Sequence, residues 1–259
     1  MANDGVRIVT EGGIDSYLAA ADETTAELLT SKEPLVAALR EYDTYFREGL
    51  WRQYQPPAVP LVLCMNAYQL FLAGSRMALS GHCAAVFPLL RTALESAAYA
   101  SLMTHKPDLQ EIWTRRHQGE ADKKACRKAF NFEKAIGLLK HRAPDIHALA
   151  ALIYEGAIDY GAHPNIKGVF GHVSIEDQDA DFVSVSHTSL YGATHIETIR
   201  GLCACLDFGL AIISVIALSS PEISGALLAD LSHLNEAKNA ATKRYEREVD
   251  ADAVAEGYV

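Results

Sequence analysis

Apolar residues recur at three- and four-residue steps along most of the chain, the spacing of one face of an α-helix. The pattern predicts amphipathic helices over residues 14–30 and 34–52, and Pro34 suits a first helical turn. Three prolines in residues 53–60 then predict a stiff connector, because each proline fixes φ and restricts the residue before it.

Two further segments, residues 60–79 and 82–104, are apolar on most faces and meet at Ser80–Gly81. Such helices lie inside a bundle, so we expect a central helical hairpin. Pro88 lies within the second segment, where it either kinks the helix or marks its first turn.

From residue 108 onward, polar, apolar and alternating segments follow one another. Residues 108–141 are more polar and predict one broken helix or two, and residues 145–162 predict another helix. Alternating positions in residues 169–187 predict a small β-hairpin. An apolar helix over residues 192–219 and an amphipathic helix over residues 222–248 follow.

These elements predict an all-α fold, a helical bundle of about seven helices with a small β-hairpin insertion near residues 169–187. We expect the N-terminal helices of residues 1–56 to pack on a bundle formed by residues 57–249. Residues 250–259 are expected to be a frayed tail.

Composition narrows the class of protein. The chain has 259 residues, of which 49% are hydrophobic and 22% charged, which fits a soluble globular protein. Its five cysteines form no C-x-x-C pair and no secretory signal opens the chain, so we expect a reduced, cytoplasmic protein. A net charge of −10 argues against a broad, non-specific grip on nucleic acid.

The most apolar stretch, residues 201–220, raises the question of a membrane. Asp207 interrupts it, and too few residues remain before Pro221 for the ~20 that a spanning helix needs. We therefore expect a core helix and no membrane partner.

The best candidate for a functional site is a charged pair in the apolar segment 82–104. Arg91 and Glu95 are four residues apart and share one helix face. Burying two ions costs several kcal/mol each unless good geometry and further hydrogen bonds compensate. The pair fixes the packing of two helices, lies at a helix edge with both charged groups in solvent, or belongs to a functional polar site.

A histidine at the end of the predicted helix 145–162 is the second candidate. Pro164 disfavours a helical conformation at His163, which places the imidazole on a turn beside Tyr160 and Asn165. An imidazole there can exchange protons near neutral pH, or it can be satisfied by a backbone carbonyl.

The segment "GHCAAVFPLLRTALE" (81–95) followed by "YGAHPN" (160–165) resembles a bacterial helical family of unknown function that is related to HEPN domains of toxin and abortive-infection proteins. The resemblance covers roughly residues 60–165. It implies a helical bundle, often dimeric, with Arg91, Glu95, His163 and Pro164 facing a shared groove, and Tyr160 and Asn165 beside them. A role in stress response or phage defence rests on the resemblance alone.

The chain departs from the ribonuclease members of that group, which carry R-x4–6-H in one helix. The near match here, Arg142 to His147, has Ala143 after the arginine and Pro144 in its middle, so one helix would not present both side chains. The resemblance therefore implies the fold more than RNA cleavage.

Residues 115–128 contain the one basic cluster, formed by Arg115, Arg116, Lys123, Lys124, Arg127 and Lys128. These side chains can contact phosphates, or they can form a solvated helix face with Glu120 and Asp122 as counter-charges. No aromatic residues interleave with them, as a stacking platform for bases would require.

Our first interpretation is a homodimeric interaction or anion-binding module without metal or cofactor. In it Glu95 orients Arg91, Arg91 binds an anionic group such as a phosphate, and His163 hydrogen-bonds or exchanges protons nearby. The expected ligand-binding side chains are those of Tyr160, Asn165, Arg115, Arg116, Lys123 and Lys124. The alternative is a ribonuclease-like enzyme that processes RNA or nucleotides with the same cluster.

Overall fold

The computed structural model describes residues 12–162, 164–178 and 183–245. It confirms a predominantly helical fold with one small antiparallel hairpin. The α-helices are α1 (Ile14–Thr30), α2 (Pro34–Thr44), α3 (Leu50–Gln53), α4 (Ala58–Leu79), α5 (Cys83–His105), α6 (Leu109–Thr114), α7 (Glu120–Ala129), α8 (Phe132–Ile136), α9 (Leu139–Arg142), α10 (Pro144–Ala157), α11 (Ile166–Phe170), α12 (Ile196–Ala217) and α13 (Gly225–Thr242). Two π-helical turns, η1 (Tyr45–Gly49) and η2 (Ile158–Ala162), extend α2 and α10, and the strands are β1 (Val173–Gln178) and β2 (Val183–His187).

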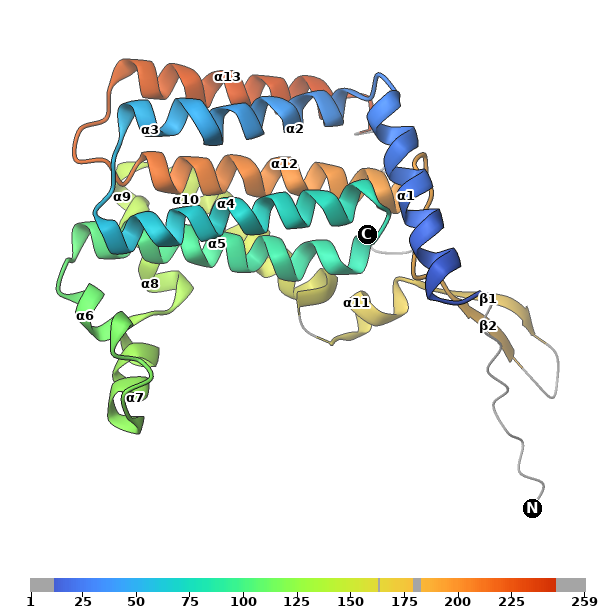
Figure 1. Cartoon of the computed structure of the whole chain (residues 1–259), viewed down its shortest axis with the longest axis horizontal. Coiled ribbons are helices and arrows are strands. Elements are labelled where there is room, and N and C mark those ends of the chain that lie inside the picture. The colour runs from blue at the N-terminus through green and yellow to red at the C-terminus, as the bar shows by residue number, and fades with distance from the viewer. Residues whose placement is uncertain (1–11, 163, 179–182, 246–259) are drawn as a thin grey trace.

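Helix α12 is the centre of the bundle. Figure 1 shows α2 and α13 on one side of it and α4 and α5 on the other, while α1 crosses one end. Helix α12 packs against α2, α4, α5, α10 and α13, and nearly all of its second half is buried. The apolar stretch that contains Asp207 is thus the core helix that the sequence predicts.

The N-terminal helices lie on the same core as the rest of the bundle. Helix α2 packs against α12 and α13, and the hydroxyl of the fully buried Tyr42 donates to the carbonyl oxygen of Leu234 at 3.1 Å. This hydrogen bond ties the start of the chain to α13. The predicted tail, residues 250–259, lies outside the described residues.

Helices α4 and α5 form the predicted central hairpin, joined through Ser80, Gly81 and His82. Gly81 has φ +77°, and a Cβ there would collide with the carbonyl oxygen of Tyr191, so the turn requires glycine. Pro88 lies inside α5 and does not mark its first turn, since the helix begins at Cys83.

Two predicted boundaries are wrong. Residues 108–141 form four short helices, α6 to α9, because capping residues restart the chain: Asn131, for example, accepts from the backbone N–H of Lys134 at 2.8 Å and begins α8. Val169 belongs to α11 and not to a strand, because Asn165 accepts from the N–H of Gly168 at 2.9 Å and starts a helical turn.

Two helices of the described residues are long and apolar enough to cross a membrane by length and composition alone. They are Ala58–Leu79, with a mean hydropathy of 1.4, and Ile196–Ala217, with a mean hydropathy of 2.0. A buried core helix passes the same test, and 78% of the most apolar window of α12 is buried, against 39% of that of α4. The cytoplasmic location stays a prediction.

Candidate functional site

Arg91 and Glu95 are joined by a tyrosine that the sequence analysis did not single out. The Nη2 of Arg91 donates to the hydroxyl of Tyr154 at 2.7 Å, and that hydroxyl donates to Oε1 of Glu95 at 2.7 Å. The Nε of Arg91 lies 3.4 Å from the same carboxylate oxygen. The three side chains form a closed polar cluster between α5 and α10, which we call the Arg91 cluster.

Packing holds the Arg91 cluster in place. The ring of Tyr154 stacks on Phe132 of α8 with centroids 3.8 Å apart and planes 8° apart. The guanidinium carbon of Arg91 lies 4.6 Å from the centroid of the Tyr154 ring, which is cation–π distance. Helices α5, α8 and α10 are therefore linked through one tyrosine.

The Arg91 cluster is partly buried, and its electrostatics follow from that. The side chains of Arg91 and Glu95 are 18% and 28% exposed. Burial raises the pKa of Tyr154; the hydrogen bond from Arg91 opposes this shift, and the hydrogen bond to Glu95 adds to it. The phenol therefore stays protonated at neutral pH and remains a donor to the Glu95 carboxylate.

Three further residues of the predicted site come from the segment after α10. His163 lies outside the described residues. Tyr160 is 56% exposed, with its ring centroid 5.7 Å from that of Phe87 on α5. Asn165 donates to the carbonyl of Ile158 at 2.6 Å in addition to capping α11, so its side chain fixes the local backbone.

Two side chains of the basic cluster, those of Arg115 and Lys123, form ion pairs. Arg115 lies 3.2 Å from Glu111 and 3.5 Å from Asp122, and Lys123 lies 3.2 Å from Glu120. These are the counter-charged, solvated contacts that one of the two sequence interpretations anticipates. Lys124 is exposed on α7.

Arg116 and Arg127 are placed differently, since both line a pocket. The pocket lies between α5 and the α6–α7 arm (residues 109–129), which projects from the bundle in Figure 1. We call it the α5–α7 pocket. It has a volume of about 580 Å³ and is lined by Glu95, Tyr99, Trp113, Thr114, Arg116, His117, Cys126, Arg127 and Phe130.

The cations of the α5–α7 pocket lack acidic partners in the described part of the chain. Neither Arg116 nor Arg127 has a carboxylate oxygen within 4.0 Å there. The Nη1 of Arg116 contacts the sulfur of Cys126 at 3.9 Å, and a thiol is a weak acceptor. Two guanidinium groups with this much unused donor capacity are suited to an anion.

Three aromatic rings contribute to the same pocket. Tyr99 and Phe130 contact edge to face, with centroids 5.3 Å apart and planes 69° apart, and Trp113 comes from α6. Burial raises the pKa of Tyr99 to about 12, with a contribution from Glu95, so this phenol is a donor at neutral pH. The aromatic residues missing from the sequence of the basic cluster are supplied by the fold.

The Arg91 cluster and the α5–α7 pocket share Glu95. Its carboxylate accepts from Tyr154 inside the cluster, and its side chain also lines the pocket. The cluster therefore fixes the position of a carboxylate at the edge of a cavity. Of the predicted site residues, Glu95 and the ligand-binding candidate Arg116 line this cavity.

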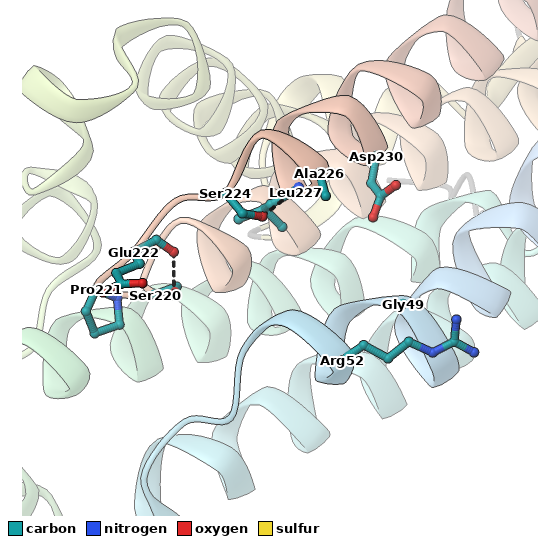
Figure 2. A pocket seen from close by; sticks show the side chains of 9 residues that line it. All are labelled: Gly49, Arg52, Ser220, Pro221, Glu222, Ser224, Ala226, Leu227 and Asp230. Carbon is teal, nitrogen blue, oxygen red and sulfur yellow. Dashed lines mark hydrogen bonds between the residues drawn. The ribbon is translucent and has the colours of Figure 1, made fainter.

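A larger cavity, of about 720 Å³, lies between the α3 region and the start of α13 (Figure 2). Its charged side chains are Arg52, Glu222 and Asp230, so carboxylates outnumber the guanidinium. The hydroxyl of Ser220 is already used, since it donates to the carbonyl oxygen of Glu222 at 2.8 Å. This lining is less suited to an anion than that of the α5–α7 pocket.

Metal binding has no candidate in the part of the chain that the structure describes, where no group of three or more His, Cys, Asp or Glu side chains could hold an ion.

The chain matches no protein-family model, no curated protein and no solved structure. The resemblance to HEPN-related domains stays a prediction.

Proposed function

We propose that the protein is an anion-binding helical module and that its ligand occupies the α5–α7 pocket. The observation that carries the proposal is the placement of Arg116 and Arg127 on one concave surface without carboxylate partners among the described residues. Guanidinium groups bind phosphate or carboxylate oxygens through charge-assisted, often bidentate hydrogen bonds. His117 adds a further polar side chain to the same wall.

In this proposal the Arg91 cluster has a supporting part. Its hydrogen bonds occupy Arg91 and hold α10 against α5, and they fix Glu95 beside the ligand. Arg91 thus stabilises the packing of α5 against α10. The anion is bound by Arg116 and Arg127 and not, as the sequence predicts, by Arg91. The alternative function, processing of RNA or nucleotides by Arg91, Glu95 and His163, requires Arg91 to leave Tyr154.

Isothermal titration calorimetry with inorganic phosphate tests the proposal. Wild type should bind, and Arg116→Gln or Arg127→Gln should each weaken binding about tenfold, which corresponds to ~1.4 kcal/mol for a lost charge-assisted hydrogen bond. Arg115→Gln is the matched control, because Arg115 is adjacent in sequence and paired with Glu111 and Asp122. Absence of binding by wild type, or an equal loss in the Arg115 variant, would contradict the proposed site.

We also propose that two copies of the chain associate through α4. This helix exposes Val62 (60%), Met65 (51%) and Leu72 (40%), and it has no charged residue between Ala58 and Ser75. Exposed apolar faces of this kind mark association surfaces. Because each chain has a net charge of −10, two copies repel least where an uncharged face meets its own equivalent across a two-fold axis.

A further inference from the structure

The aromatic side chains of the α5–α7 pocket indicate which class of ligand it binds. This inference rests on the proposed anion-binding function. We propose that the ligand is an aromatic or heteroaromatic ring that bears an anionic group. The ring would contact Trp113, Tyr99 and Phe130, and the anionic group would contact Arg116 and Arg127.

The side chains that line the pocket differ in exposure. Phe130 is 7% exposed and Tyr99 and Trp113 are half-buried, whereas Arg127 and His117 are exposed. Arg116 is half-buried, like Tyr99 and Trp113. The most buried of these side chains is thus an aromatic ring and the most exposed ones are polar, so a ligand that contacts both has an apolar, flat end and a charged end.

The aromatic wall of the pocket, formed by Phe130 and Tyr99, has a fixed position. Phe130 follows α7 directly and packs edge to face on Tyr99 of α5, so both rings are held by the bundle. Aromatic rings prefer offset stacking or edge-to-face contact with other rings. A flat ring that enters the pocket gains these contacts without reordering its wall.

The pocket also contains two polar groups, the hydroxyl of Tyr99 and the carboxylate of Glu95. Tyr99 keeps its phenolic proton because burial raises its pKa to about 12, so it donates a hydrogen bond. Glu95 accepts, and the Arg91 cluster fixes its orientation. A ring with both donor and acceptor atoms at its edge would satisfy Tyr99 and Glu95 together, as a nucleobase or a substituted phenyl ring does.

The volume agrees with such a ligand. Small-molecule sites in proteins span about 300–1,000 Å³ and combine apolar walls with a few convergent polar groups. The α5–α7 pocket, at about 580 Å³, lies within that range. An inorganic anion alone would leave the aromatic part of the lining without a partner.

Calorimetry on the full chain tests the inference with four probes. Inorganic phosphate and ribose 5-phosphate have no aromatic ring, whereas phenyl phosphate and adenosine 5′-monophosphate have one. We expect at least one ring-bearing phosphate to bind about tenfold more tightly than both ring-free phosphates, in line with the stabilisation that base–aromatic stacking provides. Tighter binding of the nucleotide or of phenyl phosphate then tells which ring the pocket prefers.

Trp113→Leu should remove this preference, so that ring-bearing and ring-free phosphates bind with similar affinity, while Trp51→Leu serves as the tryptophan control away from the pocket. Should Trp113→Leu fail to fold, Trp51→Phe leaves Trp113 as the single tryptophan, and ring-bearing phosphates should change its emission where ring-free ones do not. Equal binding of ring-bearing and ring-free phosphates overturns the inference and leaves anion binding intact. No binding of any phosphate overturns both.

Discussion

Tyr154 of α10 donates its hydroxyl to Oε1 of Glu95 of α5 at 2.7 Å, and the same hydroxyl accepts from Arg91 at 2.7 Å. One phenol thus completes a charged pair that α5 alone would leave with a single 3.4 Å contact. Partly buried charges are tolerated when further hydrogen bonds satisfy them, and Tyr154 supplies these bonds.

Removal of that phenol should therefore destabilise the fold. We expect Tyr154→Phe to keep the stacking on Phe132 and to lower the free energy of unfolding by about 1–3 kcal/mol, because two charged groups lose a partner. Urea denaturation measures the change. Tyr160→Phe is the control, since Tyr160 is exposed and should change stability by no more than about 0.5 kcal/mol.

Arg91→Ala separates the two interpretations of the charged pair. If Arg91 packs helices, the variant should lose about 1–3 kcal/mol, because Glu95 and Tyr154 remain without it. Arg76→Ala removes an exposed ion pair with Asp22 and should cost less than about 1 kcal/mol. An Arg91 variant with unchanged stability and lost phosphate binding would instead make Arg91 a ligand-binding residue.

A charge on the exposed face of α4 should prevent association of two copies. Met65→Glu places a carboxylate between Val62 and Leu72, and we expect it to shift the mass from dimer to monomer in size-exclusion chromatography with light scattering. Leu228→Glu on α13 is the control, because Leu228 is 52% exposed on another helix. A monomeric wild type would refute the proposed interface.

Lowering the pH should reduce the stability of the fold through His172, which lies directly before β1. The Nδ1 of His172 lies 2.8 Å from the hydroxyl of Tyr191, and burial lowers the pKa of His172 below its usual 6.5, with His187 adding to the shift and Glu197 opposing it. Below pH 6.5 the unfolded chain then binds more protons than the folded one, so stability falls as the pH falls.

His172→Gln removes this titrating group, so the variant should lose less thermal stability than wild type between pH 7 and pH 5. Thermal unfolding across that range measures the difference. His233→Gln is the control, because His233 is exposed on α13. Identical pH profiles of wild type and His172→Gln would show that His172 does not contribute.

The sequence predicts the long elements of the fold well. Residues 60–79 and 82–104, which are apolar on most faces, correspond to α4 and α5, and the most apolar stretch is the central helix α12. Long segments that are apolar on most faces are readily assigned to the interior of a bundle. Residues 108–141 contain no such segment, since caps such as Asn131 set the boundaries of α6 to α9 and the local sequence is polar.

The candidate site was only partly predictable for a related reason. Arg91 and Glu95 share one helix face, so their spacing shows the pair. Tyr154 reaches the site from α10, and no spacing rule joins it to Arg91, whereas Tyr99 lies four residues after Glu95 on α5 and shares its helix face. No spacing rule joins Tyr99 to Arg116. Trp113 lies just before the basic cluster and Phe130 just after it, and these two residues are the local signals of an aromatic contribution.

The most direct test of the proposed function is the position of a bound anion in crystals of the protein soaked in tungstate, a tetrahedral dianion with strong anomalous scattering. We expect an anomalous peak within hydrogen-bond distance of Arg116 and Arg127 in the α5–α7 pocket, and its loss in the Arg116→Gln variant. A peak at Arg91 with Tyr154 displaced, or no peak in the pocket, would contradict the assignment.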